Sequence, residues 1–361
     1  MGARRYLLWC VCATLVFVVA CAAFAVLVDP YCVYGSPTVA GLTEIKPNVY
    51  RQIDLAKTRQ LERAAANALV LGNSRSEIGI DPASRFWPAD LRPVYNASIA
   101  GRGPFTSRLM LREAIALHPI KLALLSVDFD DFLGAPDWYD NPPPPVGPAE
   151  RRLLVDRNGA PNRGRVWQIW RDRLATTLSI DALTDSLTTL FDQSPTGSTT
   201  LTPFGFNPLR EYAVLESRIG YYGMFAEKQR AYLTQYSAYA KPNFADPVVN
   251  PSLSQLRYIL SVATANGVEL ILFIPPYHAT YLEMVKQVGL WGSFEAWKAL
   301  LVRTAAEASR QSGKPIRLFD FSGFNKYTTE HVPPAGDRRT VMRWYWEPGH
   351  YKSALGEHIL A

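Results

Sequence analysis

An uncharged apolar run near the N-terminus constrains this chain more than any other feature. The run extends from Tyr6 to Val28 and follows Arg4 and Arg5. At about 1.5 Å per helical residue it spans roughly 35 Å, enough to cross a bilayer core of about 30 Å. No Lys or Arg follows the run before Lys46. The positive-inside rule therefore predicts a single-pass protein of the bacterial inner (cytoplasmic) membrane, with its C-terminal part facing the periplasm or the exterior.

We expect residues 1–32 to form a cytoplasmic tip and an uncleaved transmembrane signal-anchor. A cleaved secretory signal is the main alternative, although such signals usually have a shorter apolar stretch and a small-residue cleavage site. A lipoprotein anchored at Cys21 is a lesser alternative, because the residues after Cys21 stay apolar. Cys10, Cys12 and Cys21 lie inside the run, Cys32 follows it, and the exported body has no cysteine. A thiol enzyme or a zinc–thiolate site is therefore excluded there.

The composition describes a chain that can bury a core. Of its 361 residues, 48% are hydrophobic and 19% are charged, which excludes intrinsic disorder. Lys and Arg number 38 against 32 Asp and Glu, with no dense basic run, so we expect no nucleic-acid partner.

Short apolar runs alternate with helical patterns along the exported part. The runs predict strands at residues 68–71, 94–96, 122–127, 268–274 and 316–319. The helical patterns cover residues 104–117, 252–265, 297–311 and 351–360. This alternation predicts an α/β fold with a mostly parallel sheet and helices on both faces, a three-layer α/β/α arrangement.

The domain organisation follows from the same pattern. We expect a juxtamembrane linker at residues 33–65 and the α/β domain at 66–361, with a largely helical insertion at about 132–251. Six aromatic side chains of the insertion either stack on sugar rings or pack in a core: Trp167, Trp170, Tyr221, Tyr222, Tyr232 and Tyr236.

The residues that follow the strands include a candidate nucleophile, base and acid. Ligands meet the carboxyl ends of the strands in a doubly wound sheet. Ser74 follows the first strand on a tight turn that Gly72 allows, at a helix start that favours developing negative charge. A serine hydroxyl needs a base, and the base needs an orienting group. His350 is the candidate base, and Glu347, three residues earlier, can hold its other ring nitrogen.

In chain order these residues resemble the SGNH/GDSL hydrolase superfamily, over residues 68–131 and 268–361. The resemblance implies Ser74 as nucleophile, His350 as base and Glu347 as acid, with the Ser74 and Gly101 N–H groups forming the oxyanion hole. The chain is most similar to membrane-anchored, exported members with a Gly-x-Ser-Arg turn, some of which transfer acetyl groups on surface or secreted polysaccharides.

The resemblance thus implies a serine-dependent esterase, an acyl-ester hydrolase or O-acyl(acetyl)transferase of the cell envelope, that acts on a glycan. It implies no cofactor and no metal. The expected partners are the membrane, a polysaccharide or acyl donor, and components of an envelope assembly.

Three departures from the family pattern keep an alternative open. Asn73 and Glu347 each stand where the family has Asp, and Asp128 follows the third strand where an oxyanion-binding Asn is usual. A carboxylate there would repel an oxyanion, and loss of one such donor costs about 10²–10³ in rate. Ser74 and Glu77 also fit a helix capping box. The alternative is a catalytically inactive SGNH-like scaffold or glycan-binding component of a polysaccharide assembly.

Three further residues are candidate substrate contacts. Arg75 either binds an anionic group or pairs with Glu77, and we prefer the pair. Asp128 belongs to a cluster of carboxylates with Asp130 and Asp131. We interpret this cluster as solvated charges of a loop and not as a metal site. His278 follows the fourth strand and is predicted to face the cleft.

Overall fold

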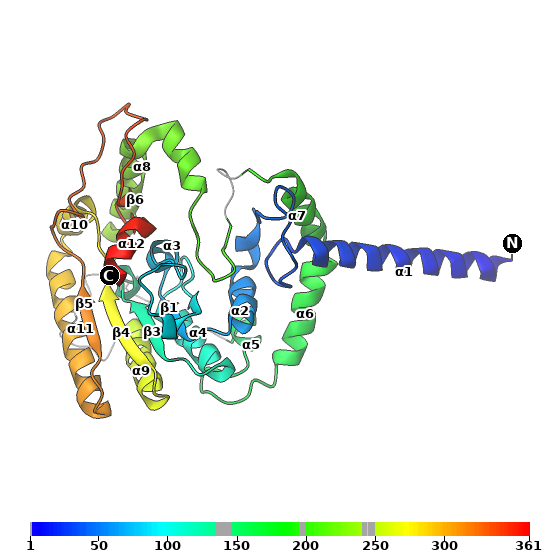
Figure 1. The fold of residues 1–361 in the computed structure, drawn as a ribbon, viewed down its shortest axis with the longest axis horizontal. Coiled ribbons are helices and arrows are strands. Elements are labelled where there is room, and N and C mark those ends of the chain that lie inside the picture. Colours follow the sequence, from blue (N-terminus) through cyan, green and yellow to red (C-terminus); the bar gives the residue numbers. More distant parts are fainter. Residues whose placement is uncertain (1, 135–145, 195–199, 240–243, 245–249) are drawn as a thin grey trace.

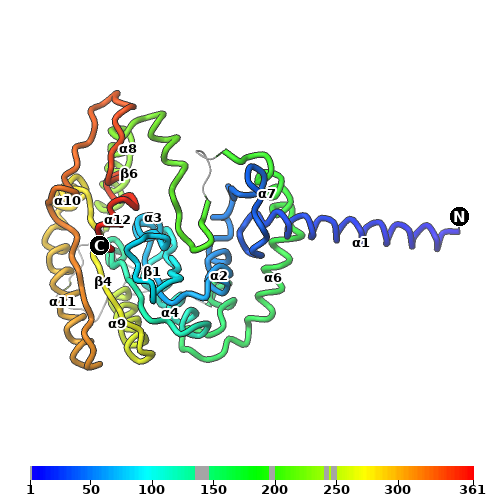
Figure 2. Tube along the Cα trace, viewed as in Figure 1, coloured from blue at the N-terminus to red at the C-terminus, as the bar shows by residue number. Residues whose placement is uncertain are grey.

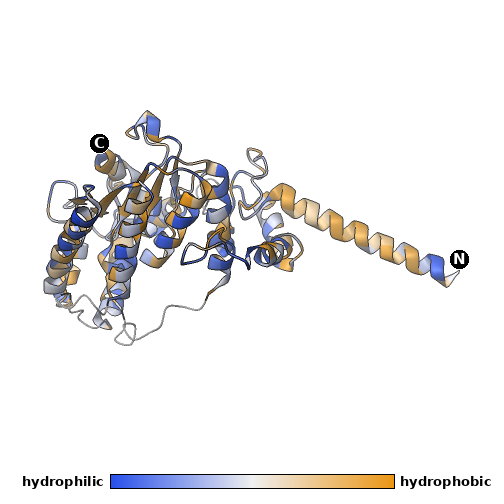
Figure 3. Cartoon of the chain, turned by 90° about the horizontal axis from the view of Figure 1, so that it is seen from below, coloured by the Kyte–Doolittle hydropathy of each residue, from blue (hydrophilic) through white to orange (hydrophobic). Residues whose placement is uncertain are grey.

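A long helix, α1, projects from a mixed α/β body in the computed structural model of the protein (Figure 1). The structure describes residues 2–134, 146–194, 200–239, 244 and 250–361. Helix α1 spans Ala3–Val28 and is long and apolar enough to cross a membrane, and an 18-residue stretch within it has a mean hydropathy of 2.9. Figure 3 shows apolar residues along nearly all of its length. Ala25 is among its few buried residues, so most of α1 lies outside the body.

The body contains seven strands and a larger set of helices among the described residues. The strands are β1 (Ala68–Leu71), β2 (Val94–Asn96), β3 (Leu122–Ser126), β4 (Glu269–Ile274), β5 (Arg317–Asp320), β6 (Tyr345–Glu347) and β7 (His350–Tyr351). The helices are α2 (Ile53–Ala64), α3 (Ser74–Gly79), α4 (Pro104–Leu117), α5 (Pro148–Arg151), α6 (Arg165–Thr177), α7 (Ile180–Phe191), α8 (Glu211–Ser237), α9 (Pro251–Ala265), α10 (Ala279–Gln287), α11 (Trp291–Ser312) and α12 (Ser353–Leu360). Short 3-10 turns occupy Val49–Gln52, Ala89–Leu91 and Phe129–Phe132.

Strands β1 to β5 form one parallel sheet in the order β2-β1-β3-β4-β5. The expected α/β class and parallel sheet are therefore confirmed, and each strand lies within one residue of its predicted bounds. The direction of chain progression reverses between β1 and β3, and ligands of open α/β sheets bind at such a switch point, outside the carboxyl ends of the strands. The turn after β1, which carries Ser74, lies there.

Apolar cores cover both faces of the sheet, because alternate residues of a strand point to opposite sides. Leu71 and Leu125 belong to the core that includes residues of α4, α9 and α11. Val70 and Leu124 belong to a second core, which includes Leu355 of α12 and aromatic residues of the β6–β7 hairpin. A strand buried on both faces is uniformly apolar, which explains why these runs were recognisable in the sequence.

Two segments differ from the expectations. The predicted linker contains α2, whose Leu61 lies in the main core, so this helix packs with the α/β body. The predicted last helix begins only at Ser353, because Tyr351 belongs to β7 and its ring packs against Gly79.

The predicted insertion contains α5 to α8, and residues 135–145, 195–199, 240–243 and 245–249 of it lie outside the described residues. Figure 2 shows this segment passing from α6 and α7, beside α1, to α8, beside β6.

Candidate active site

Ser74 and His350 are 276 positions apart in the chain and lie in hydrogen-bond contact. Ser74 Oγ is 2.7 Å from His350 Nε2, and both side chains are partly exposed. Ser74 is the first residue of α3, directly after the turn that leaves β1. Gly72 makes this turn with a φ of +146°, and a Cβ there would come within 2.8 Å of the Ser126 side chain. The imidazole is placed to accept the hydroxyl proton while the hydroxyl remains reachable.

The β6–β7 hairpin brings Glu347 to the other nitrogen of the same imidazole. The two residues pair across the hairpin, and Glu347 Oε1 contacts His350 Nδ1. Glu347 is fully buried, and its Oε2 accepts the Gly349 N–H at 3.1 Å. Burial favours the neutral acid, but the charge and hydrogen bond of His350 outweigh it and hold the pKa of Glu347 below its usual value. An ionised carboxylate at Nδ1 fixes the tautomer in which Nε2 accepts a proton.

Asn73, and not Ser74, caps helix α3. Asn73 is the N-cap residue, and its Oδ1 accepts the Arg75 N–H at 3.0 Å. The alternative role of Ser74 and Glu77 as a capping box is therefore wrong, since the cap lies one residue earlier. The Ser74 hydroxyl is not used in capping and bonds to the imidazole instead.

Arg75 holds the β6–β7 hairpin against α3. Its Nε donates to the Gly349 carbonyl at 2.7 Å, within the turn between Glu347 and His350. Its guanidinium forms ion pairs with Asp128 and, at 2.9 Å, with Asp130. The expected pair with Glu77 is wrong, because these two aspartates take its place.

Arg75 and Asp128 are both buried, which does not support a direct substrate contact for either. Asp128 directs its carboxylate to Arg75 and to the Tyr277 hydroxyl at 2.9 Å. It does not line the cleft of Ser74 and His350, so it is not placed to repel an oxyanion there. Among the described residues, no group of three or more His, Cys, Asp or Glu side chains is arranged to hold a metal.

His278 lies in the interior and not in the cleft. Only 2% of its surface is exposed, and it caps α10 through a 3.2 Å bond from the Thr280 N–H to Nδ1. Its Nε2 lies 2.8 Å from the Glu330 carbonyl oxygen. Burial lowers the pKa of His278. The expected substrate contact is therefore not supported, and the residue has a structural role.

Gly101 follows β2 in a loop that runs beside the end of β1. The Ile99 N–H donates to the Gly72 carbonyl at 3.2 Å, which brings this loop to the turn that carries Ser74. Gly101 itself is exposed and has a φ of +69°. Neither its N–H nor that of Ser74 has an acceptor within the part of the chain that the structure describes. Ser74 lines the cleft described next, whereas Gly101 does not and only its neighbour Ala100 does, so the Ser74 N–H is the better placed of the two for binding an oxyanion.

Ser74 and His350 open into a cleft of about 350 Å³. Its other lining residues come from several elements: Tyr50, Glu77, Ile78, Ala100, Asn207, Leu209, Glu211 and Tyr212. Residues 207–212 belong to the predicted insertion, so this segment forms part of the cleft wall.

A buried ion pair supports the floor of this cleft. Lys57 Nζ lies 3.0 Å from Glu77 Oε1, and both side chains are fully buried. Glu77 Oε2 accepts the Tyr50 hydroxyl at 3.0 Å and the Ala100 N–H at 3.2 Å. Asn207 Nδ2 donates to the Tyr50 hydroxyl at 2.7 Å. The sequence did not indicate these contacts, because their partners come from distant segments and no local pattern marks them.

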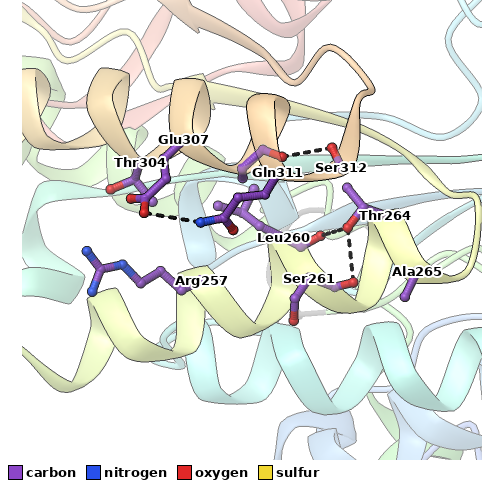
Figure 4. Close-up of a pocket in the computed structure, with 10 residues that line it drawn as sticks. Arg257, Leu260, Ser261, Thr264, Ala265, Thr304, Glu307, Gln311 and Ser312 are labelled. Carbon is purple, nitrogen blue, oxygen red and sulfur yellow. Dashed lines mark hydrogen bonds between the residues drawn. The ribbon is translucent and has the colours of Figure 1, made fainter.

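A second groove, of about 410 Å³, lies between α9 and α11 (Figure 4). Its polar side chains bond mainly to their own helices, as Gln311 does to Glu307 and Thr264 to the Leu260 carbonyl. The groove contains no nucleophile–base pair among its lining residues, so the smaller cleft at Ser74 is the better candidate site.

No model of a known protein family matches this sequence, and no curated protein matches it.

Proposed function

We propose that the protein is a serine-dependent acyl-ester hydrolase or O-acyl(acetyl)transferase that acts on a glycan in the cell envelope. The single observation that carries the proposal is the continuous contact from Ser74 to His350 to Glu347. A weak nucleophile, a base and an orienting acid stand in the order that acyl transfer needs. They do so at the switch point of the sheet, where ligands of this fold class bind.

The proposed reaction has two acyl-transfer steps. Ser74 Oγ forms a bond to the acyl carbonyl carbon while His350 Nε2 takes the hydroxyl proton. Glu347 stabilises the resulting imidazolium, and the Ser74 and Gly101 N–H groups donate to the oxyanion. The ester bond to the leaving alcohol then breaks, and His350 returns the proton to that alcohol. Water or a sugar hydroxyl attacks the acyl-serine with His350 as base, which releases the acid or the new ester and restores Ser74.

We also propose a protein family and a cellular location for this chain. The resemblance to exported SGNH proteins with a Gly-x-Ser-Arg turn, together with the strand order, supports a three-layer α/β/α domain of that superfamily. The length and hydropathy of α1 support a single-pass anchor in a bacterial inner membrane. Arg4 and Arg5 favour an exported domain facing the periplasm. Polysaccharide-assembly components are its proposed partners, and the reaction as written uses no cofactor.

The non-catalytic alternative loses two of its supporting observations. Ser74 is not the helix cap, because Asn73 has that role. Asp128 bonds to Arg75 and not toward the cleft. We therefore favour the enzyme over an inactive scaffold or a glycan-binding component.

A fluorophosphonate probe tests the proposal, since it reacts with activated serine nucleophiles. We expect the full-length protein in detergent to be labelled at Ser74, and Ser74→Ala and His350→Ala to lose the label. Ser76→Ala is the matched control, because Ser76 lies on the same helix and bonds to Ser98 Oγ at 2.9 Å, away from the imidazole. A folded wild-type protein that takes no label would favour the scaffold.

A donor–acceptor assay separates hydrolase from transferase. With an acetyl ester as donor, release of free acetate indicates hydrolysis, whereas acetylated oligosaccharide indicates transfer. Tyr212 in the cleft wall offers an aromatic face for a sugar ring, so we expect Tyr212→Ala to raise the KM for the saccharide more than the KM for a simple ester.

A further inference from the structure

Helices α6 and α7 bury several polar side chains and expose most of their large apolar side chains. Trp167 is 68% exposed, Ile180 80% and Phe191 85%. The large apolar residues exposed on these helices and the turn between them are Val166, Trp167, Trp170, Leu174, Leu178, Ile180, Leu187 and Phe191. A surface helix of a water-soluble domain has the opposite arrangement, with its apolar stripe toward the core.

The inward polar side chains are well bonded, so the orientation of both helices is fixed. On α6, Asp172 pairs with Arg152 at 3.0 Å. On α7, Asp185 accepts the Tyr31 hydroxyl at 2.6 Å and the Asn48 amide at 2.8 Å. Rotating either helix to bury its apolar face would break these buried contacts, each of which is costly to leave unmade. The outward apolar face is therefore a stable feature of the fold.

The C-terminal end of α1 indicates what covers the exposed apolar face of α6 and α7. Both α6 and α7 pack against α1, and Figure 1 shows α6 running across the base of α1. Ala25 and Val28 of α1 are buried in this packing. The exposed, uncharged segment from Tyr6 to Ala20 is about 22 Å long at about 1.5 Å per residue, which is shorter than a hydrocarbon core of about 30 Å. If α1 spans the bilayer, the hydrocarbon core therefore extends beyond Ala20, and the membrane surface meets the protein at the level of α6 and α7.

We propose that α6 and α7 form a membrane-surface foot that inserts its apolar face into the headgroup–acyl boundary of the bilayer that α1 spans. Trp side chains favour that boundary, and Trp167 and Trp170 lie on the exposed face. Arg171 and Arg173 are exposed on the same helix, where they can reach lipid phosphates. The foot and α1 together would fix the height and tilt of the body over the membrane. This inference is independent of the chemistry at Ser74.

Tryptophan quenching by brominated lipids tests the foot directly. The full-length protein is placed in nanodiscs of phosphatidylethanolamine and phosphatidylglycerol, with or without bromine on the acyl chains near the headgroup. A Trp9→Phe background removes the tryptophan within α1, which any spanning helix would expose to quencher. Trp167→Phe with Trp170→Phe is the test variant. Trp291→Phe on α11, which lies on the opposite side of the body from α1 in Figure 1, is the matched control.

We expect brominated lipid to quench the Trp9→Phe protein and the control variant to the same extent, and the test variant to lose most of that quenching. Trp9, Trp167 and Trp170 are exposed, Trp291 is only partly buried, and Phe keeps an aromatic ring at each position, so all variants should keep the wild-type far-UV circular dichroism spectrum. Two results would overturn the proposal. One is an absence of quenching in the Trp9→Phe background. The other is quenching that persists unchanged without Trp167 and Trp170, which would leave the face for a protein partner.

Discussion

Replacing Glu347 by Gln removes one charge from the site and leaves its shape almost unchanged. The two carboxylate oxygens accept from two different donors, His350 Nδ1–H and the Gly349 N–H. An amide has one oxygen and one NH₂ group, so it cannot accept both bonds. If the amide oxygen accepts from Gly349, its NH₂ faces Nδ1 and favours the tautomer protonated at Nε2, which cannot take the Ser74 proton.

The opposite amide orientation is also unfavourable. Its oxygen then accepts from His350, but the NH₂ group faces the Gly349 N–H and leaves a buried donor without an acceptor, at about 1–3 kcal/mol. The first orientation should therefore predominate. An acid-to-amide change of this type in a serine–histidine–acid triad lowers kcat by about 10⁴. That factor corresponds to about 5.4 kcal/mol of transition-state stabilisation at about 1.36 kcal/mol per decade.

The assay is hydrolysis of a chromogenic acetyl ester by the full-length protein in detergent at neutral pH. Glu347→Asp is the matched control, since it keeps the charge with a shorter reach and should retain more activity than Glu347→Gln. Circular dichroism confirms that both variants are folded. A kcat for Glu347→Gln within tenfold of wild type would refute the assignment of this carboxylate to the imidazole.

Three further predictions follow from the site geometry. Asn73→Ala should lower the free energy of unfolding by about 1 kcal/mol, whereas Ser74→Ala should change it by less than about 0.5 kcal/mol, because only Asn73 caps α3. Urea unfolding measures both values, and a larger loss for Ser74→Ala than for Asn73→Ala would contradict the assignment of Asn73 as the cap. Arg75→Met should cost about 3–5 kcal/mol in the same measurement, since it leaves Asp128 buried without its cation, and Arg75→Met with Asp128→Asn should recover part of that loss. Burial lowers the pKa of His278, so the imidazole binds a proton more readily in the unfolded chain than in the folded protein. The stability that the neutral imidazole contributes is therefore complete above about pH 6.5, and it is lost as the pH falls through the lowered pKa of the folded state. His278→Gln should weaken the pH dependence of urea unfolding between pH 7.5 and 5, and an unchanged dependence would show that another group is responsible.

The parallel sheet could be predicted from sequence because buried strands carry a local pattern. Runs such as residues 68–71 and 122–126 are uniformly apolar and end at turn residues, so their bounds were nearly correct. The hairpin of β6 and β7 was not predicted. Its strands are only three and two residues long, too short for an alternating pattern to stand out.

The proximity of Ser74 and His350 followed from the order of the sheet and the family resemblance. The roles of the charged residues around them did not. The predicted pair of Arg75 with Glu77 is wrong, because side chains two residues apart on a helix do not face each other, and the fold offers Arg75 two aspartates from the loop after β3. Glu77 forms its ion pair with Lys57 instead. Which acid meets which base inside a core depends on tertiary packing, and side-chain spacing along one helix does not determine it.

Trapping of the acyl-enzyme tests the central claim most directly. The full-length protein is mixed with an activated acetyl ester, quenched in acid within the first turnover, digested and analysed by mass spectrometry. We expect one acetyl group on the peptide that contains Ser74, and we expect this acetylation to be strongly slowed in His350→Ala. Ester turnover with no acetyl group on Ser74, or acetylation that proceeds at the wild-type rate without His350, would contradict it.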